Sequence, residues 1–198
     1  MSTLLKPLQV RADLIRRETS VFTGQDFARI FRVTKLRAKY FLEAYTKVGL
    51  FIRLKRGLYA LHDQFPSEEE IANLLYRPSY LSFEYALAVY AVLPEMVYTV
   101  TSATTMSSRT FVVEEKTYTY STIKQGAFTG YGPIKRDNRT ILMAEPEKAL
   151  VDYLYFVSLG KRPSNDRLAL AKLDRNKVLQ YARLYHRKGL EQIVREVL

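Results

Sequence analysis

Apolar residues recur at helical spacing in three segments of the first fifty residues. The segment Pro7–Glu18 predicts a first helix. Thr23, followed three residues later by Asp26, is an N-cap signal that predicts a short second helix ending near Phe31. Thr34 predicts the start of a third helix, whose polar side carries lysines. The positions expected to face inward from this helix are Ala38, Phe41, Leu42, Tyr45 and Val48.

After Gly49 the pattern changes from helical spacing to the alternation that is typical of strands. Two alternating runs, Leu50–Leu54 and Leu58–Leu61, are separated by the basic turn Lys55–Gly57. Two short helices followed by a basic hairpin are typical of a winged helix-turn-helix, whose second helix lies in the major groove of DNA. The sequence therefore predicts such a domain over residues 1–63, although the same elements also occur in protein-interaction domains.

Candidate DNA contacts follow from these positions. Side chains near the start of the third helix are expected to meet base edges or the flanking phosphates. Arg37, at the edge of the buried arc, is expected to contact a phosphate. The basic turn is expected to lie along the backbone or the minor groove. The predicted DNA-binding residues are Lys35, Leu36, Arg37, Lys39, Tyr40, Lys47, Arg53, Lys55 and Arg56.

Charge is distributed unevenly along the chain. The formal net charge is +11, and residues 1–62 hold 13 lysines and arginines against 4 acidic residues, whereas the remainder holds 18 against 16. A basic N-terminal domain favours a polyanionic partner, because each cation placed at a phosphate releases condensed counterions. A solvated basic surface without a partner is the alternative interpretation.

A second domain is expected over residues 67–198, after a short linker at Asp63–Ser67. Helices are expected from Ser67 to Tyr76, from Ser82 to just before Pro94, from Glu145 onward, and in a tail from about Asp166 with a break at Gly189. Strands are expected at Val97–Ser102, Thr110–Glu114, Tyr118–Ile123 and Thr140–Met143. The predicted fold class is therefore α+β: a winged helix-turn-helix, then a mixed domain with a small antiparallel sheet and a helical tail.

Composition narrows the possible chemistry. The chain has no cysteine and only two histidines, which excludes disulfides, thiolate metal sites and an all-imidazole zinc site. No apolar stretch approaches the roughly 20 residues of a membrane span, and the N-terminus lacks the pattern of a signal peptide. We expect a cytoplasmic protein that has no membrane association, is not an enzyme and uses no cofactor or metal.

Two features leave an alternative open in the second domain. Glu145, Glu147, Lys148 and Asp152 gather around a predicted helix start, where they resemble the acidic and lysine residues of a nuclease. The alternative is a nuclease that uses Glu145, Glu147 and Lys148 with a divalent metal. Carboxylates at a helix N-terminus also compensate the helix dipole, which requires no catalysis. The hydroxyl-rich run Thr99–Ser108 could line a phosphate-binding surface, or be a strand end followed by a turn.

Four segments resemble the AbiEi family of antitoxins from type IV toxin-antitoxin systems. "VFTGQDFARIF" from Val21 and "GLFIRLKRGLYAL" from Gly49 resemble its opening winged helix. "PSYLSFEYALAVYAVLPEMVYTVTSATT" from Pro78 and "AEPEKALVDYLYF" from Ala144 resemble its second domain, in the same order and spacing.

This resemblance implies a transcriptional repressor that binds inverted repeats of double-stranded DNA in the promoter of its own operon. It also implies an antitoxin that counteracts, directly or indirectly, a nucleotidyltransferase-type toxin. The family's functional residues are basic side chains of the winged helix, which correspond here to Lys35, Lys39, Lys55 and Arg56. A pure protein-interaction module without DNA binding remains the competing interpretation.

Overall fold

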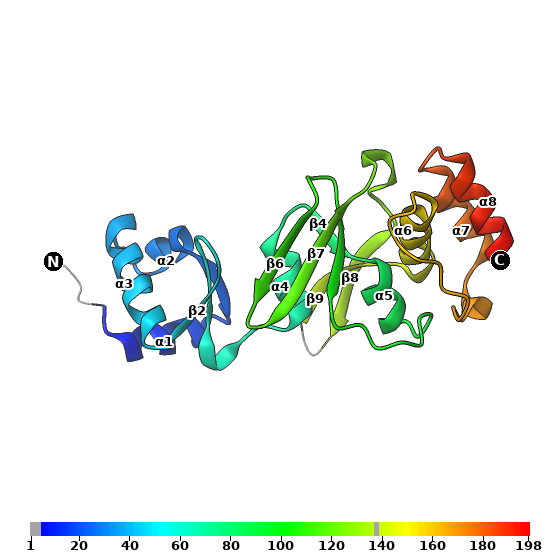
Figure 1. The fold of residues 1–198 in the computed structure, drawn as a ribbon. Coiled ribbons are helices and arrows are strands. Elements are labelled where there is room, and N and C mark those ends of the chain that lie inside the picture. The colour runs from blue at the N-terminus through cyan, green and yellow to red at the C-terminus, as the bar shows by residue number, and fades with distance from the viewer. Residues whose placement is uncertain (1–4, 137–138) are drawn as a thin grey trace. The chain divides into compact units, whose positions relative to one another are not determined.

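The structure, a computed structural model, describes residues 5–136 and 139–198, and the chain divides at Ser67 into two compact units. Unit 1 ends at Ser67, and unit 2 is Glu68–Leu198. Residues 1–4 of the expected first domain lie outside the described residues. Helices and strands occur in both units (Figure 1), so the predicted α+β fold class is confirmed.

Over residues 5–67, unit 1 contains three α-helices and a three-stranded antiparallel sheet. In chain order its elements are α1 (Pro7–Arg16), β1 (Val21–Thr23), α2 (Gly24–Ile30), α3 (Lys35–Lys47), β2 (Phe51–Lys55) and β3 (Leu58–Leu61), and a short 3-10 helix (His62–Gln64) follows. The strand order is β1-β3-β2. Strand β1 was not predicted, because three residues are too few to show an alternating pattern.

The predicted caps and turns of unit 1 are confirmed. The Thr23 hydroxyl accepts a hydrogen bond from the backbone nitrogen of Asp26 at 3.1 Å, and the Asp26 carboxylate accepts one from the Thr23 nitrogen at 3.1 Å. These reciprocal bonds satisfy two backbone N–H groups that the helix itself leaves unpaired. Thr34 caps α3 with a single bond, in which its hydroxyl accepts from the Arg37 nitrogen at 3.3 Å. Gly49 and Gly57 both have φ near +80°, a conformation that favours glycine where a helix ends and a hairpin turns.

The core of unit 1 is largely aromatic. The Phe22 ring packs 5.9 Å from Phe27 and 5.6 Å from Phe51, which joins β1, α2 and β2. Of the positions expected to face inward from α3, Ala38 and Leu42 are fully buried. Val48 is 71% exposed, so its expected burial is wrong. The helix ends at Lys47 and Val48 is its C-cap, where the chain leaves the helical path and Leu50 packs on the core instead.

Unit 2 is built on a six-stranded mixed sheet with helices on both faces. Its elements are α4 (Glu68–Leu75), β4 (Ser79–Leu81), α5 (Phe83–Val89), β5 (Val100–Thr104), β6 (Arg109–Val113), β7 (Lys116–Thr122), β8 (Tyr131–Arg136), β9 (Arg139–Ala144), α6 (Pro146–Ser158), α7 (Arg175–Arg183) and α8 (Lys188–Val197). Short 3-10 helices lie at Gln125–Ala127 and Leu170–Lys172.

The sheet differs from the small antiparallel sheet that the sequence predicted. Its order is β6-β7-β5-β4-β9-β8, and the β5–β7 and β4–β9 pairs are parallel. Strands β4 and β8 were not predicted. Strand β4 has only three residues, and its partner β9 lies some sixty positions later, so no local pattern indicates the pair.

The two faces of the sheet can be told apart by register. Thr101 on β5 pairs with Thr119 on β7, and the Thr101 hydroxyl accepts a hydrogen bond from the Tyr85 nitrogen of α5 at 3.1 Å. Tyr120 points to the opposite face, where its hydroxyl donates to the Ala72 carbonyl of α4 at 2.6 Å. Helices α5 and α4 therefore cover opposite faces, since neighbouring residues of a strand alternate in direction.

The tail packs on α6 through α7 and α8. The chain turns between these helices at Leu184–Arg187, where His186 has φ +44°. The break expected at Gly189 is therefore wrong, since Gly189 lies inside α8. Tyr185 is fully buried, and its burial fixes the position of the turn more strongly than the low helix propensity of a glycine.

Candidate nucleic-acid interface

A groove of about 410 Å³ lies along one flank of α3 in unit 1. Lys35 and Lys39, one helical turn apart, line it beside the buried Leu42. The facing wall comes from the hairpin, through Gly57 in the turn and Tyr59 on β3. The cationic flank of α3 and the hairpin turn therefore belong to one contiguous surface.

The start of α2 closes the end of this groove. Thr23, Gly24 and Gln25 contribute to its lining. The Gly24 nitrogen donates a hydrogen bond to the Gly57 carbonyl at 3.4 Å, which ties the hairpin turn to the start of α2. One backbone hydrogen bond thus joins two walls of the groove, while the long side chains of Lys35, Lys39 and Gln25 also contribute to its lining.

The other predicted contacts on α3 occupy different parts of its surface. Leu36 and Tyr40 are 59% and 62% exposed and lie next to the lysine flank on the outward arc. Arg37 is half-buried, in agreement with its expected place at the edge of the buried arc. Lys47 is exposed, but it lies twelve residues after Lys35, which is about 18 Å along a helix axis.

The hairpin presents its cations at and near the turn. Arg56 is exposed in the turn and Arg53 is exposed on β2, whereas Lys55 is half-buried. The pairing of β2 with β3 is irregular between Arg53 and Lys55. Such a bulge increases local twist and changes the direction of the side chains around it.

Two acidic groups of unit 1, Asp13 and Asp26, are paired with arginines of their own helices. Asp13 pairs with Arg16 at 2.6 Å, and Asp26 pairs with Arg29 at 2.8 Å. Hydrogen bonds from the Thr23 hydroxyl and backbone lower the pKa of Asp26, so this carboxylate is stabilised by its capping role. Within residues 5–136 and 139–198, neither Lys35 nor Lys39 forms an ion pair, so both ammonium groups can meet an external anion.

A second cationic groove of unit 1 was missed by the sequence analysis. Arg17, Arg29 and Arg32, with Thr19 and Ile30, line a groove of about 630 Å³. The three arginines come from the end of α1, from α2 and from the turn before α3. No periodic pattern links them, so only the packing of the helices brings them together.

The acidic cluster of unit 2 is engaged in internal contacts. Glu145 accepts hydrogen bonds from Lys177 and Tyr181 of α7, each at 3.0 Å. Glu147 is buried, and its carboxylate accepts a bond from the Asp174 nitrogen at 3.1 Å. These groups hold α7 against the start of α6, which is not the open arrangement that the nuclease alternative requires.

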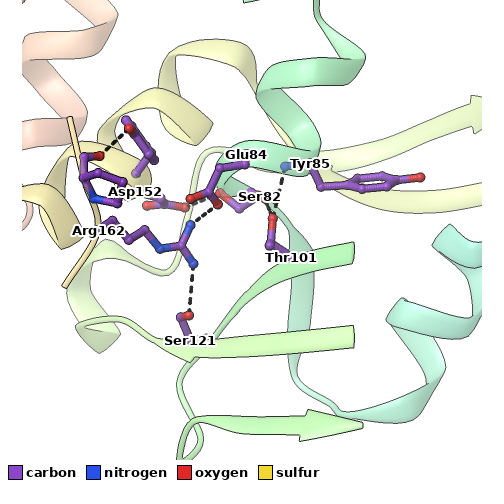
Figure 2. A network of polar contacts seen from close by, with 9 residues as sticks. Ser82, Glu84, Tyr85, Thr101, Ser121, Asp152 and Arg162 are labelled. Carbon is purple, nitrogen blue, oxygen red and sulfur yellow. Dashed lines mark hydrogen bonds and ion pairs between the residues drawn. The ribbon is translucent and has the colours of Figure 1, made fainter. Parts of the chain in front are cut away.

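Lys148 and Asp152 are fully buried and form an ion pair one helical turn apart. Burial lowers the pKa of Lys148, and the Asp152 carboxylate opposes this effect. Asp152 also accepts hydrogen bonds from Tyr80 at 3.0 Å, from Ser82 at 2.7 Å (Figure 2) and from Tyr185. Lys148 and Asp152 were predicted only as members of a cluster at a helix start, so this buried network was not predicted.

The described residues contain neither a candidate metal cluster nor a membrane-spanning helix. Within 5–136 and 139–198, no three or more His, Asp or Glu side chains are grouped so that they could hold a metal ion. None of the helices in the same ranges combines the length and apolar character needed to cross a membrane.

Comparison of the chain with protein-family models gives no match, and comparison with curated proteins gives none either. The resemblance to AbiEi-family antitoxins therefore stays a prediction. The function of the Lys35–Lys39 groove has to be argued from its geometry and charge.

Proposed function

We propose that this chain is a DNA-binding transcriptional repressor whose unit 1 acts as a winged helix-turn-helix. Helices α2 and α3 would form the helix-turn-helix, and the β2–β3 hairpin would be the wing. One observation carries the proposal: Lys35 and Lys39 of α3 line the same groove as Gly57 of the hairpin turn. A duplex that receives α3 in its major groove would meet the wing on the same surface.

Five exposed side chains have a role in this arrangement. Lys35 and Lys39 neutralise phosphates or reach base edges at the groove rim. Leu36 and Tyr40 are exposed apolar side chains on the outward arc of α3, and such side chains suit contacts with thymine methyl groups. Arg56 in the exposed turn suits the backbone or the minor groove beside the main contact.

The arginine groove extends the cationic surface of unit 1. Arg17 and Arg32 are exposed, and neither forms an ion pair within the described chain. Contacts of arginine with phosphate position a protein on a duplex without reading its sequence. We assign these arginines to affinity and the exposed arc of α3 to specificity.

The second part of the proposal depends on the resemblance to AbiEi-family antitoxins. In this interpretation the chain represses the promoter of its own toxin-antitoxin operon and counteracts a nucleotidyltransferase-type toxin. Unit 2 would supply the antitoxin activity. No residue of unit 2 is assigned to the toxin.

A mobility-shift assay on a DNA fragment carrying the promoter of the chain's own operon tests the DNA-binding proposal. The variant Lys35→Glu/Lys39→Glu should lose the shift, because two phosphate contacts become repulsions. The matched control is Lys6→Glu/Lys172→Glu, which changes the net charge by the same amount at exposed positions outside the groove. This control should retain most of the binding.

Circular dichroism of both variants separates a binding defect from a folding defect. All four substituted side chains are exposed, so both variants should keep the helical signal of the parent protein. If the groove variant and the control lose the shift equally, general charge accounts for binding and the proposed interface is wrong. If the groove variant binds as well as the parent chain, α3 does not enter the duplex.

A further inference from the structure

A third groove, in unit 2, has the chemistry of an oxyanion site. It measures about 470 Å³ and lies where β6 and β7, at the edge of the sheet, meet the segment that follows α6. Its side-chain hydroxyls belong to Ser108, Thr110, Thr119 and Ser121, and Lys161, Arg162 and Phe156 line the other wall.

Three of these hydroxyls, those of Thr110, Thr119 and Ser121, share one face of the sheet. Thr110 of β6 pairs directly with Thr119 of β7, so their side chains project on the same side. Ser121, two residues after Thr119 on the same strand, projects on that side as well. Helix α5 covers this same face at β5, so the hydroxyls and that helix lie on one side of the sheet.

Arg162 is held in position at the inner wall of this groove. Its guanidinium pairs with Glu84, lies 4.2 Å from the centre of the Phe83 ring, and donates to the Ser121 hydroxyl at 3.3 Å. Figure 2 shows Arg162 between Glu84 and Ser121. A guanidinium has five N–H donors, and these contacts account for two of them, so donors remain for an anion.

Lys161 supplies a second cation to this groove. It is exposed, precedes Arg162 in the chain, and forms no ion pair among residues 5–136 and 139–198. Arg109 also borders the groove, but its guanidinium lies 5.5 Å from the centre of the Tyr76 ring, on the face covered by α4. Lys161 and Arg162 are therefore the cations that can act together here.

We propose that this groove binds the phosphate group of a small phosphorylated ligand. Lys161 would attract the dianion as a mobile point charge, and Arg162 would donate to it from a fixed guanidinium. The Thr110 and Thr119 hydroxyls, which bond to no described protein group, would donate to the remaining phosphate oxygens. Phe156 would pack against the organic part. This site is independent of the DNA-binding proposal for unit 1.

Isothermal titration calorimetry of the full chain with adenosine 5′-monophosphate, inorganic phosphate and adenosine tests the proposal. The monophosphate or free phosphate should bind with one site per chain, and adenosine should not bind. Binding of the monophosphate alone identifies a phosphate ester as the ligand, and equal binding of both identifies a site for free phosphate. The variants Lys161→Gln and Thr119→Val should each weaken binding, the first by roughly tenfold or more because it removes a charge-assisted contact.

Two controls guard against binding elsewhere on this basic chain. Lys172→Gln removes an exposed charge from unit 2 outside the groove, and Lys35→Gln/Lys39→Gln removes the candidate DNA contacts. Both should bind the phosphate ligand as the parent chain does. The proposal is overturned if no phosphate probe binds at millimolar concentrations, if Lys161→Gln binds normally, or if either control loses as much affinity as Lys161→Gln.

Discussion

Breaking the buried ion pair of unit 2 should destabilise the protein more than removing both of its charges. In the variant Asp152→Asn the shape of the side chain is kept, and the amide oxygen can still accept from Tyr80 and Ser82. The amide cannot neutralise Lys148, whose ammonium group is fully buried. An uncompensated buried charge costs about 3–5 kcal/mol. That is a large part of the 5–15 kcal/mol by which folded domains are typically stable.

Adding Lys148→Met to Asp152→Asn should recover much of this loss. The methionine keeps an aliphatic chain of similar length and removes the unpaired charge, so the double variant should be more stable than the single variant by about 2 kcal/mol or more. Urea denaturation followed by circular dichroism measures the free energies of unfolding, and the chain has no tryptophan whose fluorescence could be used instead. A double variant less stable than Asp152→Asn would refute the reasoning.

The same pair of variants gives a pH test. Burial lowers the pKa of Lys148 in the folded protein below 10.5, its ordinary value in the unfolded chain. Between the folded-state pKa and 10.5, the unfolded state therefore binds more protons than the folded state. Stability therefore rises with pH in that interval. In Asp152→Asn, where the carboxylate no longer opposes desolvation, the pKa of Lys148 should fall further, so the deficit in stability relative to the parent should shrink as the pH rises toward 10.5. The double variant, which lacks the lysine, should show no such recovery.

Three further predictions concern stability. Gly130→Ala should lower the free energy of unfolding by about 2 kcal/mol or more, because Gly130 has φ +72° and its new Cβ would lie 2.6 Å from the Tyr181 ring. In the control Gly132→Ala the new Cβ meets no atom, so the loss in the same urea assay should be less than about 0.5 kcal/mol. Thr23→Ala should lower the free energy of unfolding by about 1 kcal/mol at neutral pH, because the helix loses its cap. Thr23 is the main cause of the lowered pKa of Asp26, so the variant should also lose less stability than the parent as the pH falls below 3.8. Above a pH of about 10 the free energy of unfolding should fall by about 1.4 kcal/mol per pH unit for each fully buried tyrosine. Burial raises the pKa of these phenols in the folded state, so the unfolded state binds fewer protons at alkaline pH. Urea denaturation across an alkaline pH series measures the effect. The phenols are Tyr80, Tyr118, Tyr120 and Tyr185.

Unit 1 was predictable because its signals are local. The Thr23 and Thr34 caps and the Gly49 and Gly57 turns each depend on a few neighbouring residues. The lysine flank of α3 follows from helical spacing once the start of the helix is known. The arginine groove was not predictable, because its side chains are brought together only by packing between helices.

Unit 2 was less predictable because its structure depends on distant partners. The parallel pairing of β4 with β9 and the short strand β4 have no local pattern that indicates them. Lys148 and Asp152 look like surface residues by type, and they are buried because Tyr185, from the turn between α7 and α8, closes over them. The proposed phosphate groove of unit 2 likewise combines the β6–β7 strand pair with Lys161 and Arg162, some forty residues later in the chain.

The salt dependence of promoter binding tests most directly whether unit 1 binds DNA through the Lys35–Lys39 groove. Fluorescence anisotropy gives the affinity for the promoter fragment at a series of salt concentrations. With about five phosphate contacts, the logarithm of affinity should fall with the logarithm of salt with a slope of about −4 to −5. The groove variant, Lys35→Gln/Lys39→Gln, should reduce the size of that slope by about 2. The control variant, Lys6→Gln/Lys172→Gln, should leave the slope unchanged. A flat response of the parent chain, or the same slope in the groove variant, would contradict the account.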